Sequence, residues 1–288
     1  MQMEADCIPC LLGRVLYETN LCSPAKKSEV MRECVKVLCS EYEEGVNSAE
    51  IATMVHRRAY DLLDCKDPYF DLKKRSNEIA DSIFPKAKDF VAAAKDPLEA
   101  AALVSIAGNV LDFGIDAALE NPESLAEEFD SLVGQGLAIN DVPMMRELLE
   151  NAENVVYLLD NCGEVVFDKL LVEELKWFGV RIVGVVKGEP ILTDATEEDA
   201  RAVGIDKLFD EVLSTESFAV GIDLNLVGER LRKEIDRADL VISKGMANFE
   251  SLSNSDLGPI AYLLRAKCLP VAIAIGADVG DNVVRVYE

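Results

Sequence analysis

Acidic, amide and lysine side chains recur just after three apolar runs of the sequence. Asp160, Asn161 and Glu164 follow the run at 155–159. The others are Lys187 and Asp194 after the run at 181–186, and Lys244, Asn248 and Glu250 after the run at 239–243. Carboxylate and amide oxygens suit a hard divalent cation such as Mg²⁺ or Mn²⁺, and lysines offset the charge of a phosphate. This combination favours phosphoryl chemistry, where catalysis is mostly positioning and charge neutralisation.

Each of these residues also has a purely structural interpretation. Asp and Asn after a strand are common turn residues and helix N-caps, and the helix dipole favours a glutamate such as Glu164 near a helix start. The recurrence of such residues after three separate runs is what favours a functional site over turns and caps.

The apolar runs must be strands of one sheet if their ends are to meet. From residue 136 onward, short β-branched runs alternate with helical stretches, which is typical of an α/β domain. Their continuous apolar character indicates a mostly parallel central sheet covered by helices, and such sheets bind ligands beyond the carboxyl ends of their strands. The runs expected to form strands are 155–159, 181–186, 207–213, 239–243, 270–275 and 283–287. The last two should pair antiparallel, because their link is too short for a helical crossover.

The first part of the chain has helical periodicity instead, from residue 4 to about 130. Asn47 should cap one helix, and the segment 67–70 and then Pro85 should interrupt the pattern before a small-residue helix at about 97–108. We therefore expect an all-helical region, residues 1–135, packed against an α/β metal- and phosphate-binding domain, residues 136–288.

The net charge of the chain limits the classes of molecule that it is expected to bind. Lys and Arg number 29 against 53 Asp and Glu, a formal net charge of −24, which disfavours nucleic acid and anionic lipid. No run approaches the roughly 18 apolar residues of a membrane span, and the first residues lack a signal-peptide pattern. We expect a cytoplasmic protein whose partner is a small phosphorylated metabolite; a homo-oligomer stays open.

The cysteines and the single histidine narrow the chemistry further. Most of the eight cysteines lie in apolar helical contexts, where we expect reduced thiols, at Cys65 for example, and no disulfide framework. Cys7 and Cys10 form a C-x-x-C pair that suits a metal or redox role. His56 is the single histidine, and we expect it to be a packing or helix-surface residue. A Ser-His-Asp triad and an H-E-x-x-H zinc site are therefore excluded or nearly so. A phosphate-binding G-x-x-x-x-G-K-[ST] loop is absent.

Five ordered motifs and the C-x-x-C pair resemble the metal-dependent damage-control phosphatase family, first catalogued as a domain of unknown function. They are DPYFDLKKRSN (67–77), AGNVLDFG (107–114), DNCGE (160–164), KGEPILTDAT (187–196) and SKGMANFESL (243–252). The resemblance spans nearly the whole chain, and the C-x-x-C pair makes it similar to the prokaryotic branch.

The resemblance implies hydrolysis of small phosphate monoesters, such as sugar phosphates or damaged phosphometabolites, supported by Mn²⁺, Co²⁺, Ni²⁺ or Mg²⁺. The family's metal-holding Asp-Asn pair and later Asp match Asp160, Asn161 and Asp194, which we take as catalytic together with Lys244. The residues expected at the substrate are Lys187, Glu164, Asn248, Glu250, Asn109 and Asp112. We expect water, rather than Asp160, to attack phosphorus.

Two other functions stay open at this point. One is an S-adenosylmethionine-dependent carboxyl methyltransferase, an activity described for some members of the family. The other is a noncatalytic metal or redox module centred on Cys7 and Cys10.

Overall fold

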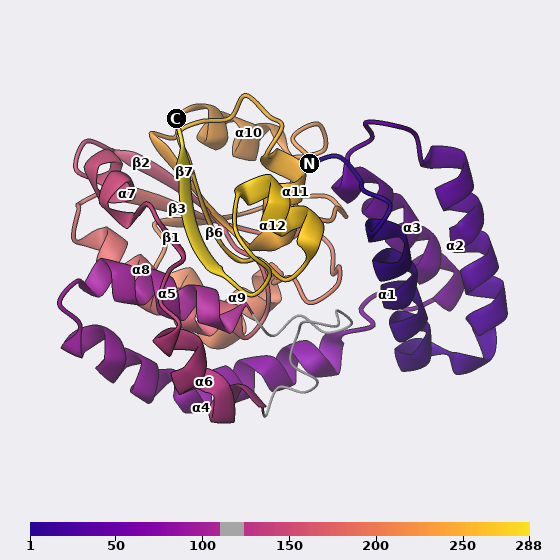
Figure 1. Cartoon of the computed structure of the whole chain (residues 1–288), viewed down its shortest axis with the longest axis horizontal. Helices are drawn as coiled ribbons and strands as arrows, with labels where there is room; N and C mark the ends of the chain where they lie inside the picture. The colour runs from indigo at the N-terminus through magenta and orange to yellow at the C-terminus, as the bar shows by residue number, and fades with distance from the viewer. Residues whose placement is uncertain (110–123) are drawn as a thin grey trace.

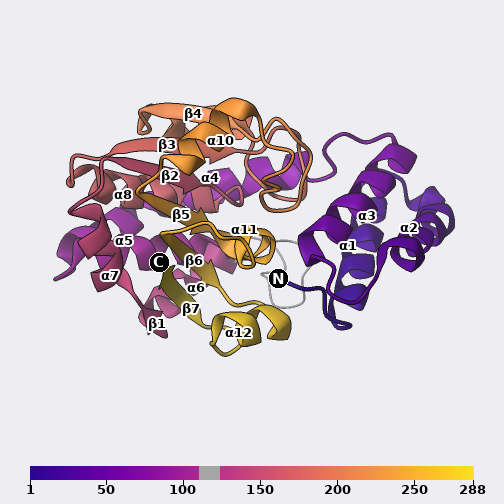
Figure 2. The same cartoon turned by 90° about the horizontal axis from the view of Figure 1, so that it is seen from above.

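The computed structural model describes residues 1–109 and 124–288, and it is an α/β protein in two parts (Figure 1). Three helices near the N-terminus form a lobe that stands to one side. A seven-stranded sheet with helices on both faces makes up the larger part, as the view from above also shows (Figure 2). The expected fold class, a mostly parallel sheet covered by helices with a helical region against it, is confirmed.

The N-terminal lobe consists of α1 (Cys7–Cys22), α2 (Lys27–Glu41) and α3 (Ser48–Leu63). Asn47 caps α3 as expected, because its side chain accepts a hydrogen bond from the Ala49 N–H at 2.9 Å. Cys22, at the end of α1, is paired as a disulfide with Cys65, which follows α3. The expectation of a reduced thiol at Cys65 is therefore wrong. Helical periodicity shows which face of a helix is apolar, but not which helix ends meet in the lobe.

Three further helices lead from the lobe to the sheet: α4 (Phe70–Ala93), α5 (Pro97–Gly108) and α6 (Ser124–Gly134). The expected helix at 97–108 is confirmed. The expected break at Pro85 is wrong, since α4 continues through it. Pro85 is exposed, so water can hydrate the carbonyl that loses its helical partner. Since α4 and α5 pack on a helix of the α/β part, the division of the chain at residue 135 stays a prediction.

The sheet has the strand order β1-β7-β6-β5-β2-β3-β4, and every neighbouring pair is parallel except β6 with β7. Its strands are β1 (Ile139–Asn140), β2 (Asn154–Leu158), β3 (Arg181–Val186), β4 (Glu211–Ser214), β5 (Leu240–Lys244), β6 (Ile260–Arg265) and β7 (Asn282–Tyr287). The helices between them are α7 (Val142–Leu149), α8 (Glu164–Lys176), α9 (Glu197–Val203), α10 (Glu229–Asp236), α11 (Gly245–Leu252) and α12 (Leu269–Ile275).

One expected strand is a helix. The run 270–275 lies in α12, and the antiparallel partner of β7 is β6, which the sequence analysis missed. Pro270 stands in the first turn of α12, and Gly276 ends the helix in the left-handed conformation with φ of 82°. Both are helix boundary signals that outweigh the apolar character of a short run.

Alternate residues of each central strand face two different apolar cores. Val155 and Tyr157 of β2 belong to a core shared with α1 to α9, whereas Val156 and Leu158 belong to a core shared with α10, α11 and α12. This burial of both faces explains the continuous apolar runs.

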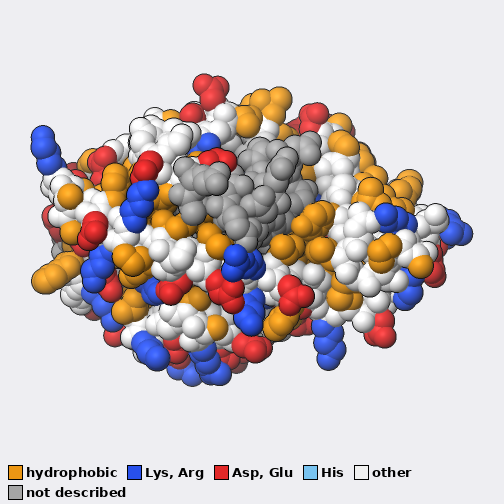
Figure 3. All heavy atoms as spheres, turned by 90° about the horizontal axis from the view of Figure 1, so that it is seen from below, with side chains coloured by type: hydrophobic (Ala, Val, Ile, Leu, Met, Phe, Trp, Pro, Cys, Tyr) orange, Lys and Arg blue, Asp and Glu red, His pale blue; other side chains and the backbone are white. Residues whose placement is uncertain are grey.

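Among the described helices, none combines the length and apolar character that a membrane crossing requires. On the face shown in Figure 3, basic and acidic side chains are interspersed.

Candidate functional site

The strand order reverses at the carboxyl ends of β2 and β5. From β2 the chain continues to β3 on one side, while β5 is its neighbour on the other side. In open α/β sheets the crevice at such a reversal is the usual ligand site. Asp160 and Asn161 follow β2, and Gly245 follows β5, so the expected metal ligands lie at this point.

Backbone hydrogen bonds hold the two segments that carry the expected metal ligands against each other. The Ala195 N–H donates to the Asp160 carbonyl, and the Cys162 N–H donates to the Thr193 carbonyl, each at 2.8 Å. Asn161 and Asp194 are thereby paired as an isolated antiparallel bridge. Residues that are more than thirty positions apart in the sequence thus meet, as the strand-end argument predicts.

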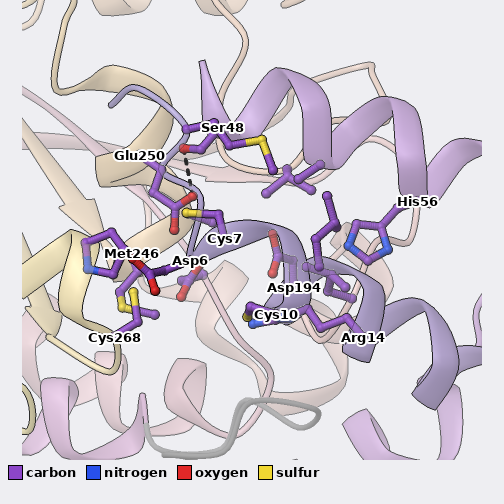
Figure 4. Close-up of a pocket in the computed structure, with 18 of the residues that line it drawn as sticks. Asp6, Cys7, Cys10, Arg14, Ser48, His56, Asp194, Met246, Glu250 and Cys268 are labelled. Atoms are coloured by element: carbon purple, nitrogen blue, oxygen red, sulfur yellow. Dashed lines mark hydrogen bonds between the residues drawn. The ribbon is translucent and has the colours of Figure 1, made fainter. Parts of the chain in front are cut away.

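Asp160, Asn161 and Asp194 line one pocket between the N-terminal lobe and the sheet edge. Figure 4 shows this pocket, with Asp194 labelled. Its other walls come from α1, α3, α11 and the start of α12. Those walls include Asp6, Cys7, Cys10, Arg14, Ser48, His56, Met246, Glu250 and Cys268. The C-x-x-C pair therefore faces the same pocket as the expected metal ligands.

The donor set in the pocket fits a hard divalent cation. Within the described residues, no group of three or more His, Cys, Asp or Glu side chains stands ready to hold a metal. The expected set, however, consists of two carboxylates and one amide, and an amide oxygen is an ordinary ligand of Mg²⁺ or Mn²⁺. Asp6 and Glu250 add two further carboxylates to the lining, so a cation entering the pocket meets four in all.

Side-chain hydrogen bonds fix the orientation of Asp160 and Asn161. Asp160 Oδ2 accepts from Asn161 Nδ2 at 2.5 Å and from Asn109 Nδ2 at 2.9 Å. Thr193 Oγ1 donates to Asn161 Oδ1 at 2.5 Å, so the amide nitrogen of Asn161 faces Asp160 and its oxygen faces Thr193. That oxygen retains a second lone pair for a cation.

A buried ion cluster lies behind Asp160. Lys244 Nζ contacts Glu164 Oε1 and, at 2.8 Å, Asp168 Oδ1, and all three side chains are fully buried. Burial raises the pKa of Glu164, against the effect of Lys244. Burial alone would lower the pKa of Lys244, but the two carboxylates outweigh it and raise that pKa. Asn109 links the cluster to the pocket, because its Nδ2 also donates to Glu164 Oε2 at 2.5 Å.

The remaining expected residues have different surroundings. Lys187 Nζ donates to the Gly221 carbonyl and lies 3.3 Å from Asp194 Oδ2, whereas Asn248 Nδ2 donates to the carbonyls of Leu159 and Lys244. Glu250 lines the pocket and accepts from Ser48 Oγ at 3.0 Å. Asp112 lies outside the described residues. The structure thus brings Asp160, Asn161, Asp194 and Glu250 to one pocket, while Lys244, Glu164, Asn109 and Asn248 support it from behind.

The pocket residues that had no functional role in the sequence analysis include Asp6, Arg14 and His56. His56 is buried, and its Nδ1 lies 2.8 Å from Oε1 of the equally buried Glu18 on α1. The available signal was the spacing on α1, since positions 7, 10, 14 and 18 share one helical face. Asp168 was also missed, although it follows Glu164 by four residues on α8 and so shares its face.

Replacing Gly245 with alanine should displace Asp160 and reduce activity at this site by about 100-fold, the scale reported for outer-shell disturbances of metal sites. Gly245 has φ of +76°, and a Cβ there would lie 1.8 Å from Asp160 Oδ2. The control is Gly204→Ala, because Gly204 has φ of +77° but nothing within 4 Å of the added carbon. Both variants carry the same backbone strain, so equal activities in a steady-state assay would contradict this prediction.

Comparisons of the sequence and of the structure with known proteins identify the same family. The family model described as the damage-control phosphatase ARMT1-like domain matches residues 3–283. The chain is 42% identical over 290 residues to a damage-control phosphatase of Archaeoglobus fulgidus, with both chains fully covered. It is 32% identical over 277 residues to a damage-control phosphatase of Pyrococcus horikoshii, covering 94% of this chain and 93% of that one. A crystal structure of a DUF89 family protein from Pyrococcus horikoshii superposes with a TM-score of 0.89 at 30% identity over the full length of both chains.

Proposed function

Because the chain belongs to the damage-control phosphatase ARMT1-like domain family, we propose that it is a metal-dependent phosphatase of small phosphate monoesters. Sugar phosphates and damaged phosphorylated metabolites are the proposed substrate class. Mn²⁺, Co²⁺, Ni²⁺ or Mg²⁺ would be the metal. The phosphatase role is supported by the relatives' names, and the metal by the donor set.

One observation carries the proposal: the carboxylates of Asp160 and Asp194 and the amide of Asn161 line one pocket at the strand-order reversal. We propose that these three side chains hold the cation. When bound, the cation would polarise the phosphoryl oxygens and make water a better nucleophile near neutral pH.

The chain's own residues would then orient the ligands and balance charge. Asp160 Oδ2 already accepts two amide hydrogen bonds, which lowers its nucleophilicity, so we propose that water rather than Asp160 attacks phosphorus. The reaction consumes one water and releases an alcohol and inorganic phosphate. Lys187 would balance the charge of Asp194, and Lys244 would act through Glu164 and Asn109 to keep Asp160 in place.

The test is hydrolysis of p-nitrophenyl phosphate by metal-stripped protein, with Mn²⁺, Co²⁺, Ni²⁺ or Mg²⁺ restored one at a time. We expect no turnover without metal and recovery with at least one ion. Circular dichroism of the stripped protein controls for unfolding. Turnover that persists unchanged after metal removal would contradict the metal dependence. Failure of every ion, with this probe and with a panel of sugar phosphates, would contradict the phosphatase assignment.

A further inference from the structure

The pocket has a charge problem that the proposed metal alone does not solve. Its described lining contains the carboxylates of Asp6, Asp160, Asp194 and Glu250. Lys187 offsets the charge of Asp194 and a divalent cation offsets two more, which leaves one of the four carboxylate charges. A phosphate monoester then brings up to two further negative charges. A substrate phosphate therefore needs a cationic side chain that reaches the pocket itself.

The two lysines expected to meet the phosphate do not line the pocket. Lys244 is fully buried between Glu164 and Asp168, and Lys187 is buried against Asp194 and the Gly221 carbonyl. Moving either ammonium toward a substrate would break a buried ion pair and leave an uncompensated carboxylate, which is strongly unfavourable.

Arg14 is the one lysine or arginine among the described residues that line the pocket. It projects from the face of α1 that also carries Cys7 and Cys10, and all three are drawn in the pocket in Figure 4. Unlike Lys187 and Lys244, which are buried and lie outside the lining, Arg14 is only partly buried and lines the pocket. An arginine binds phosphate with two parallel hydrogen bonds, whereas lysine acts as a point charge.

We propose that Arg14 binds the phosphate group of the substrate, so that the N-terminal lobe supplies phosphate recognition while the sheet edge supplies the metal. This inference rests on the proposed phosphatase function. His56 lies on the same wall, with its Nδ1 2.8 Å from Glu18 Oε1. The lobe therefore places Arg14 and His56 in the same pocket as the carboxylates of the strand ends.

The test compares Arg14→Gln and Arg14→Lys with the wild type. For the metal-loaded protein, Arg14→Gln should raise both the KM for p-nitrophenyl phosphate and the Ki for inorganic phosphate by about 10- to 100-fold, the range for a lost hydrogen bond to a charged group. The kcat should change much less, because the same contact exists before and during the reaction. For Arg14→Lys, the KM and the Ki should lie between those of the wild type and Arg14→Gln, since lysine keeps the charge but cannot form two parallel hydrogen bonds.

The matched control is Arg58→Gln. Arg58 lies on α3 in the same lobe and is also partly exposed. It pairs with Glu33 at a distance of 3.1 Å and does not line the pocket. It should leave KM and Ki unchanged. Exogenous guanidinium should partly restore phosphate binding to an Arg14→Ala variant, a rescue that a merely structural arginine would not show.

A direct binding measurement separates this inference from the proposed function. Calorimetry of inorganic phosphate with the metal-loaded protein needs no turnover. If the wild type binds phosphate and Arg14→Gln binds it equally well, the inference is wrong, whatever the enzymatic result. If the wild type hydrolyses no ester but binds phosphate through Arg14, the phosphatase function fails and the anion site stands. If the wild type does not bind phosphate at all, the inference fails.

Discussion

An Asp194→Asn variant should lose metal-dependent hydrolysis by about 1,000-fold or more, because a metal's stabilisation of a phosphoryl transition state amounts to several kcal/mol. The substitution keeps the size of the side chain but removes one of the two carboxylate charges proposed to hold the cation. It also leaves the buried ammonium of Lys187, 3.3 Å from Asp194 Oδ2, without that partner.

The measurement is kcat with saturating Mn²⁺, together with the metal dissociation constant from calorimetry. The loss should appear in both, since the charge that binds the metal is also the charge that is removed. Asp236→Asn is the control, because Asp236 is an exposed carboxylate at the end of α10. Wild-type turnover and metal affinity in Asp194→Asn would refute the assignment of Asp194 as a ligand.

A Lys244→Met variant should be destabilised by about 3–5 kcal/mol, the usual result of removing one partner of a buried ion pair. Glu164 and Asp168, both fully buried, would lose the ammonium that compensates them. For a chain of this size that loss lowers the melting temperature by roughly 10 °C. Urea unfolding of metal-free protein isolates this effect from any effect on metal binding.

A combined variant tests the stated cause. Lys244→Met with Glu164→Gln and Asp168→Asn removes the uncompensated charges as well, so it should regain a large part of the lost stability. Lys233→Met is the surface control, since Lys233 pairs with Glu229 on α10 while its side chain is 66% exposed. Its effect should stay below about 1 kcal/mol. Equal stability of Lys244→Met and wild type would show that the cluster is not a compensated ion pair.

The sequence was sufficient to place the expected metal ligands at one edge of the sheet. The apolar runs that became β2, β3 and β5 identify strands buried on both faces, and parallel strands end at a common edge. Because they follow β2 and β3, the side chains of Asp160, Asn161 and Asp194 were expected to meet at that edge. The run 270–275 shows the limit of this reasoning, because a short apolar run has no periodicity that separates strand from helix.

The direction in which a strand-end side chain points was beyond the sequence. Lys244 is the last residue of β5 and was expected at the phosphate. In the folded protein its ammonium points into the core, toward Asp168. Arg14 posed the opposite difficulty. Its helical face could be read from the spacing with Cys7 and Cys10, but only tertiary packing brings that face to a pocket formed by residues about 150 positions later.

The two walls of the pocket are encoded by separate stretches of the gene. The lobe wall lies within residues 3–56, whereas the strand-end wall begins at residue 160. If Arg14 binds the phosphate as proposed, mutation of the first stretch would alter which esters are accepted, while the residues proposed to hold the metal, encoded by the second stretch, are preserved. Such a division would let substrate preference change through substitutions in α1 and α3 while the residues at the sheet edge stay the same. Exchange of the lobe between relatives should then transfer substrate preference separately from catalysis, provided that the hydrogen bond from the Leu192 N–H to Tyr60 Oη is retained.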